Sequence, residues 1–116
     1  MQSVFDALRS IMAAQASSLD IKRDEPGDYY VDTFYLRQNK KPLWFGGVQI
    51  RKNYVSYHLM PVYVNPDLLE DISPELRKRM QGKSCFNFKV VDEKLFAELS
   101  DLTEQGLNDY ISRGFI

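Results

Sequence analysis

Apolar residues recur at helical spacing near the beginning and near the end of the chain. Near the beginning they are Phe5, Leu8, Ile11 and Met12. Ser3 occupies the position of an N-cap for this first helix. Near the end, Asp92 precedes a long amphipathic stretch in which leucine, phenylalanine and tyrosine fall on one side. The pattern therefore predicts one helix at each end of the chain.

Between these helices the chain is rich in β-branched and aromatic residues and predicts strands. The predicted strands are Leu19–Arg23, Tyr29–Arg37, Leu43–Arg51, Tyr54–Tyr63 and Ser84–Val90. Pro26-Gly27-Asp28 is typical of a turn, because proline presets one dihedral angle and glycine accepts a positive one. The pair Gly46-Gly47 inside a strand indicates a bulge or a close backbone approach.

A short helix is predicted before the last strand. Ser73 is suited to cap it, Pro74 to its first position and Glu75 to the positive end of its dipole. Its last turn would then contain Arg77, Lys78 and Arg79, and Gly82 would end it. The order of elements predicts one α+β domain over residues 1–116, with an antiparallel sheet of about five strands packed by an N-terminal helix and C-terminal helices.

Composition narrows the class of protein. The 116 residues are 44% hydrophobic and 13% aromatic, which is typical of a folded globular domain. The formal net charge of -1, with both signs mixed, lacks the positive field that nucleic-acid binding needs. No apolar run is long enough for a membrane helix, and Asp6 and Arg9 interrupt the N-terminal pattern that a signal peptide would need. One cysteine, Cys85, suits a reducing compartment, so we expect a cytoplasmic protein.

Alternation along the strands sorts residues into two faces. Trp44, Val48 and Ile50 are expected on the apolar face. The polar face is expected to collect Gln49, Arg51, Ser56, His58, Met60, Cys85, Asn87 and Lys89. We take Arg51, His58, Cys85, Asn87 and Lys89 as the candidate ligand-binding residues. A face that is only solvated is the alternative, since antiparallel sheets commonly expose one side to water.

Catalytic and metal sites are weaker hypotheses. His58 and Cys85 are of the types that form a nucleophile pair, with Lys83 as a nearby cation, but no orienting carboxylate or oxyanion arrangement accompanies them. We therefore predict no catalytic residue and no enzyme. A hard cation such as iron would find oxygen ligands in Asp67, Glu70, Asp71 and Glu75, although acids at helix starts also complement the helix dipole. The basic run from Arg77 to Lys83 is the one stretch suited to an anion.

Four segments together resemble a known family. They are the PGDY turn at Pro26, the strand Trp44-Phe45-Gly46-Gly47-Val48, KNYVSYHLMPVY at Lys52–Tyr63, and ISPELRKRMQGKSCFNFK at Ile72–Lys89. In these the chain is similar to the YdhG-like bacterial domain-of-unknown-function family. The resemblance implies a small α+β fold with terminal helices on an antiparallel sheet. It also implies a link to iron, because some members are labelled frataxin-like intracellular iron chaperones.

Two functions are expected from these observations. The first is a non-enzymatic binding module that uses the polar face of its sheet for a small ligand or a partner protein, without a cofactor. The alternative is an iron-binding chaperone of frataxin-like role that uses the acidic residues Asp67, Glu70, Asp71 and Glu75. Neither expectation includes nucleic acid or a membrane as a partner, and the oligomeric state stays open.

Overall fold

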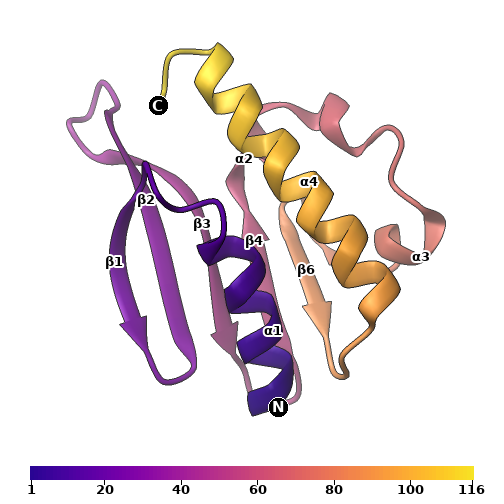
Figure 1. Cartoon of the computed structure of the whole chain (residues 1–116). Helices are drawn as coiled ribbons and strands as arrows, with labels where there is room; N and C mark the ends of the chain where they lie inside the picture. The colour runs from indigo at the N-terminus through magenta and orange to yellow at the C-terminus, as the bar shows by residue number, and fades with distance from the viewer.

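A six-stranded antiparallel sheet forms the centre of the molecule in a computed structural model that describes residues 1–116 (Figure 1). Its strands are β1 (Asp20–Glu25), β2 (Asp28–Leu36), β3 (Pro42–Ile50), β4 (Val55–Leu59), β5 (Met80–Gln81) and β6 (Cys85–Phe88). They lie in the order β1-β2-β3-β4-β6-β5, so β6 adds beside β4 and the two-residue β5 forms one edge. The predicted single α+β domain is confirmed, with six strands where about five were expected.

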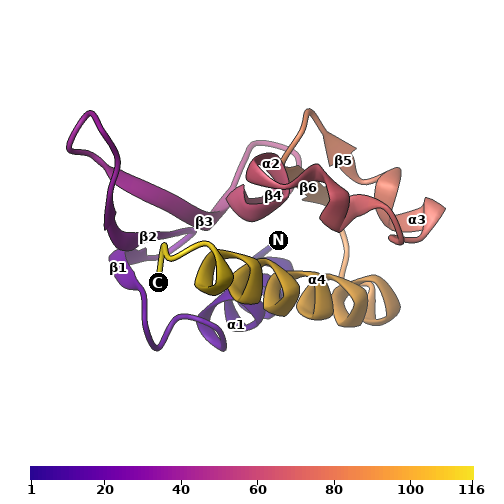
Figure 2. The same ribbon diagram turned by 90° about the horizontal axis from the view of Figure 1, so that it is seen from above.

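Two long helices, α1 (Gln2–Ala13) and α4 (Glu93–Ser112), lie together on one face of the sheet (Figure 2). We call this the helix-covered face and the opposite one the open face. The core between helices and sheet includes Phe5, Leu8, Tyr57, Phe86 and Leu99, which are all almost fully buried. Burial of these side chains is the main source of stability, so the core lies on the helix-covered face of the sheet.

The remaining helical segments are short and come between β4 and β6 in the chain, although these two strands are neighbours in the sheet. They are α2 (Met60–Val64), the 3-10 helix η1 (Pro66–Leu69) and α3 (Pro74–Arg77). The Ser73 hydroxyl caps α3 by accepting a hydrogen bond from the Leu76 amide (3.1 Å), and Asp92 caps α4 in the same way at Leu95 (3.1 Å). Ser3, in contrast, lies inside α1, which begins at Gln2, so its predicted capping role is wrong.

The strand predicted over Tyr54–Tyr63 ends at Leu59, where the chain turns into α2. Pro61 explains the early end, because its missing amide hydrogen cannot join a strand ladder but is tolerated in the first turn of a helix. Pro61 also packs against Gly106 of α4, where a Cβ would come within 2.9 Å of the proline ring. Met60 therefore belongs to a helix and not to the polar face of the sheet.

The helix predicted to contain Lys78 and Arg79 is shorter than expected. The α3 helix ends at Arg77, and the chain then forms β5, which pairs with β6 through Met80 and Phe86. Gly82, at φ +80°, lies in the turn between β5 and β6 rather than at a helix end. This edge strand brings Lys78 and Arg79 to the margin of the sheet, beside residues of β6.

A bulge at Phe45 reverses the predicted orientation of Trp44. Val31 of β2 pairs with Gly46, whereas the next residue, Asp32, pairs with Trp44, so Phe45 is the extra residue of β3. Phe45 and Gly46 both face the helices, and a Cβ on Gly46 would meet the His58 carbonyl oxygen and the Met12 side chain. Trp44 is consequently turned to the open face, because a one-residue shift moves a side chain to the other side of a sheet.

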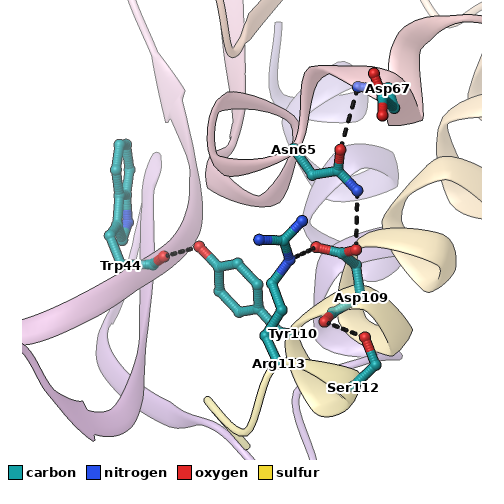
Figure 3. A network of polar contacts seen from close by, with 7 residues as sticks. All are labelled: Trp44, Asn65, Asp67, Asp109, Tyr110, Ser112 and Arg113. Atoms are coloured by element: carbon teal, nitrogen blue, oxygen red, sulfur yellow. Dashed lines mark hydrogen bonds and ion pairs between the residues drawn. The ribbon is translucent and has the colours of Figure 1, made fainter.

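The C-terminal end of α4 holds this bulge from the helix side. Tyr110, which is fully buried, donates a hydrogen bond from its hydroxyl to the Trp44 carbonyl oxygen (2.8 Å), while the Trp44 indole points away from it (Figure 3). One residue earlier, the Asp109 carboxylate accepts hydrogen bonds from Asn65 Nδ2 (2.9 Å) and Arg113 Nε (2.7 Å). These contacts join α4 to the segment between α2 and η1 and fix the backbone beneath the open face.

Candidate functional site

Three ring side chains from three neighbouring strands lie in contact across the open face. Tyr30 of β2 stacks on Trp44 of β3, with ring centroids 5.3 Å apart and planes 14° from parallel. Trp44 in turn contacts His58 of β4, with centroids 5.3 Å apart. We call Tyr30, Trp44 and His58 the aromatic row; all three are partly exposed. Arg23 of β1 extends the row, because its guanidinium carbon lies 4.5 Å from the centre of the Tyr30 ring.

Gly47 and the bulge together place the indole at the centre of this row. Gly47 pairs with Tyr30 on one side and with His58 on the other. Having no side chain, it leaves a gap; a Cβ there would come within 2.9 Å of the Tyr29 carbonyl oxygen and 3.5 Å of the Trp44 indole. Trp44 covers this gap and contacts both neighbouring rings. Its Nε1 donates to the Gly46 carbonyl oxygen (2.8 Å), which fixes the plane of the indole.

A chain of hydrogen bonds runs beside the aromatic row. Arg23 Nε donates to Asp28 (2.7 Å), and Gln49 Nε2 donates to the other oxygen of the same carboxylate (3.2 Å). Arg51 then donates to the Gln49 amide oxygen (2.9 Å). These contacts leave the amide of Gln49 in one orientation and hold the Arg51 guanidinium beside it.

The structure brings the five predicted ligand-binding residues to one region of the open face. His58 and Cys85 are direct neighbours across β4 and β6, and the Cys85 thiol donates to Asn87 Oδ1 (3.3 Å). Arg51 is close enough to act electrostatically on both His58 and Cys85. Lys89 follows the end of β6 and lines a pocket together with Asn87. Ser56, expected on the same face, pairs with Asn87 but is buried.

The pair His58 and Cys85 is not arranged as a nucleophile and its base. No hydrogen bond joins them, since the thiol is directed to Asn87. Burial raises the pKa of the Cys85 thiol, and burial followed by the nearby Arg51 charge lowers the pKa of His58. Near neutral pH both groups are therefore uncharged. A neutral thiol is a poor nucleophile.

A pocket of about 200 Å³ opens at the β5–β6 end of the sheet. Its polar lining residues are Tyr54, Lys78, Arg79, Gln81, Asn87 and Lys89, with Met80 as the remaining one. We call it the basic pocket, because it has three cationic side chains and no carboxylate. None of these three cations takes part in an ion pair; the four ion pairs of the molecule lie elsewhere. The basic pocket therefore presents uncompensated positive charge next to the open face.

The four acidic residues predicted to hold a metal are distributed along the surface. The chain contains no group of three or more histidine, cysteine, aspartate or glutamate side chains arranged to hold a metal ion. Asp67 and Glu75 lie in the first turns of η1 and α3, where the helix dipole favours acids. Glu70 is exposed, and Asp71 lines a separate depression of about 140 Å³ beside Glu98.

Sequence reasoning missed four residues that contribute to this region. Trp44 was expected on the apolar face, Tyr30 was not assigned to a face, and Lys78 and Arg79 were assigned to a helix end. For Trp44 a signal was present, because the glycine pair that follows Phe45 indicated a bulge whose effect on side-chain direction was not carried through. For Lys78 and Arg79 the two-residue strand β5 is too short to leave a periodic pattern.

No protein-family model, no curated protein and no solved structure matches the chain. The resemblance to the YdhG-like family, and with it the label of iron chaperone, stays a prediction. None of the helices has the length and apolar composition required to cross a membrane. The interpretation of the site therefore depends on its geometry and chemistry.

Proposed function

We propose that this protein is a non-enzymatic binding module that holds a small ligand on the open face of its sheet. The observation that supports this proposal best is the aromatic row. Three partly exposed rings in contact, extended by the Arg23 guanidinium, form a continuous aromatic ridge with polar groups along its margin. Such a ridge favours ligands with an apolar ring, because an aromatic contact, edge-to-face or stacked, adds about 0.5–1.5 kcal/mol for each ring pair beyond burial itself.

The cost of building this surface also supports a binding role. An indole on a water-facing side of a sheet contributes less to folding than one in the core. The chain nevertheless uses a bulge, a glycine at position 47 and the Tyr110 hydrogen bond to place Trp44 there. A sheet face that is only solvated needs none of these features. A cytoplasmic location belongs to the same proposal, since a free thiol at Cys85 is stable in a reducing compartment.

Trp44 provides the test, because it is the only tryptophan and its indole N–H has its own NMR signal. We would screen mixtures of common metabolites by following amide and indole signals of the labelled protein. Binders are expected to shift the indole signal of Trp44 and the amides of Tyr30 and His58. Shifts limited to α2 and η1, or a screen in which no compound moves the Trp44 signal, would contradict the proposal.

Two variants make the screen specific. Trp44→Leu removes the centre of the aromatic row and is expected to weaken binding of a stacking ligand at least tenfold. Tyr63→Ala is the matched control, because Tyr63 is exposed on α2, outside the aromatic row. An equal loss in both variants would show that the effect is not located on the open face.

The iron-binding alternative can be tested in the same samples. An anaerobic calorimetric titration with Fe(II), and then with Fe(III), measures binding directly. Saturable binding with NMR shifts confined to the segment 67–75 would favour the chaperone hypothesis over the proposed one. The dispersed positions of Asp67, Glu70, Asp71 and Glu75 provide no observation in favour of that alternative.

A further inference from the structure

The basic pocket and the aromatic row adjoin each other, and together they indicate a class of ligand. We propose that the open face binds nucleoside monophosphates, with the base on the aromatic row and the phosphate in the basic pocket; this inference rests on the proposed function. Both halves of such a ligand then have a chemically matched partner. The aromatic row provides a ridge of partly exposed rings for edge-to-face or stacked contact with a base, and the pocket provides positive charge with neutral hydrogen-bond donors.

Charge differs between the two ends of the open face. At the β1–β2 end the cations are already paired, Lys22 with Asp20 (2.8 Å) and Arg23 with Asp28 (2.7 Å). At the β5–β6 end, Lys78, Arg79 and Lys89 have no acidic partner. Like charges gathered around one pocket repel one another, and a bound anion removes that repulsion. The unpaired end is therefore where an anionic group of the ligand belongs.

The neutral groups of the basic pocket suit a phosphate monoester. The amide oxygen of Asn87 accepts a hydrogen bond from the Cys85 thiol, which leaves its Nδ2 group as a donor without a partner in the chain. The side chains of Gln81 and Tyr54 add further donors at the same pocket. Arg79 provides the planar guanidinium that matches two phosphate oxygens at once. A phosphate with several acceptor oxygens can use these donors together.

Strand pairing sets the separation between the two subsites. His58 lies opposite Cys85, and Asn87 is two residues further along β6. With strands about 4.8 Å apart and about 3.3 Å per residue, His58 and Asn87 are roughly 8 Å apart. One ribose bridges a separation of this kind between a base and its 5′-phosphate. The geometry thus fits a single nucleotide that lies across β4 and β6.

The same charge pattern disfavours a longer nucleic acid. Apart from Arg51, the unpaired cations of this face lie at the β5–β6 end, and the β1–β2 end contains the carboxylates of Asp20, Asp28 and the buried Asp32. A polynucleotide continuing along the row would bring its phosphates towards these acids. Polynucleotide binding needs cations that follow the backbone over several phosphates. A ligand with one phosphate meets the cations without approaching the acids.

The experiment compares adenosine 5′-monophosphate, adenosine and inorganic phosphate by calorimetry and NMR. The monophosphate is expected to bind at least tenfold tighter than either part alone, because each charge-assisted contact is worth about that factor. Binding should shift the Trp44 indole signal and the Asn87 side-chain amide in the same titration. Higher salt should weaken binding of the monophosphate much more than binding of adenosine, since only the phosphate contact is ionic.

Variants separate the two subsites. The double variant Lys78→Gln/Lys89→Gln is expected to bind the monophosphate no more tightly than adenosine, while its affinity for adenosine stays unchanged. Lys83→Gln is the matched control, because Lys83 is also exposed but lines a different pocket beside Arg77. The urea midpoint of each variant verifies that the protein is folded. Equal effects of Lys83→Gln and the double variant would overturn the phosphate subsite.

The possible failures are distinguishable from failure of the proposed function. If another metabolite shifts Trp44 but no nucleoside monophosphate does, this inference falls and the binding module stands. Adenosine binding as tightly as its monophosphate would remove the phosphate assignment alone. A single-stranded oligoadenylate that binds hundreds of times tighter than the monophosphate would overturn the nucleoside monophosphate proposal in favour of nucleic acid. If nothing shifts Trp44, both proposals fall together.

Discussion

The two faces of the sheet are made by the same strands but differ in what their side chains contact. On the helix-covered face, Tyr57 and Phe86 are fully buried under α1 and α4. On the open face, the adjoining residues His58 and Asn87 stay partly exposed and form side-chain contacts only with their neighbours on the sheet. Stability and recognition are thus divided between alternate residues of one strand, so substitutions on the two faces should have different consequences.

The largest expected effect comes from removing a ring on the helix-covered face. Phe86→Ala should lower the free energy of unfolding by about 3–5 kcal/mol, because the buried ring leaves a cavity. Its neighbour Asn87 faces the other way, and Asn87→Ala should cost less than about 1 kcal/mol. Urea denaturation of both variants measures the difference. Similar losses in the two would show that the faces are not divided as described.

An intermediate effect is expected from the hydrogen bond that joins α4 to the Trp44 backbone of β3. Tyr110→Phe removes the donor to the Trp44 carbonyl and should cost about 1–2 kcal/mol. It should also change Trp44 fluorescence, because that contact holds the bulge from which the indole projects. Tyr57→Phe removes another buried hydrogen bond, to Thr103 (2.6 Å), away from the bulge.

The comparison between these two tyrosine variants isolates the role of the bulge. Both should unfold at lower urea concentration than the unaltered protein, but only Tyr110→Phe should shift the emission of Trp44. An unchanged spectrum in Tyr110→Phe would mean that the indole is positioned by its stacking on Tyr30 and His58 alone.

The smallest effect is a dependence of stability on pH from His58. Burial and the Arg51 charge lower its pKa from 6.5, so the folded protein resists protonation more than the unfolded chain does. The contribution of His58 is therefore fully present above pH 6.5 and is lost as the pH falls through the lower pKa of the folded state. Melting temperatures between pH 7.5 and pH 5 should fall more for the unaltered protein than for His58→Gln.

Sequence patterns predicted the layers of this fold better than the direction of individual side chains. The terminal helices and the alternation in β6 are encoded locally, as are the caps at Ser73 and Asp92, and these predictions are confirmed. The orientation of Trp44 depends on the fact that Phe45 has no pairing partner in β2. That is a property of the two strands together and not of the β3 sequence alone. Pro61 contained the information that β4 ends early, but the apolar residues around it resemble a strand as much as a helix.

The candidate site shows the same division. His58, Cys85 and Asn87 lie on the face where alternation placed them, because they pair regularly within β4 and β6. Arg51 and Lys89 directly follow β3 and β6, and a ligand-binding role for the five residues stays a prediction. Tyr30 and Lys78 could not be assigned to the site from the residues next to them in the sequence. Tyr30 contacts Trp44 only because of the bulge, and Lys78 reaches the pocket through the pairing of β5 with β6.

The two edges of the sheet have a consequence for aggregation. An exposed, regular edge strand invites strands from other molecules to add to it, which begins fibril growth. Here every residue of β1 except Ile21 is charged, and its pairing with β2 is irregular between Ile21 and Arg23. The opposite edge, β5, is only two residues long. A neighbouring molecule thus finds a charged, irregular template on one side and a very short one on the other, which protects the protein at high concentration while its open face stays accessible.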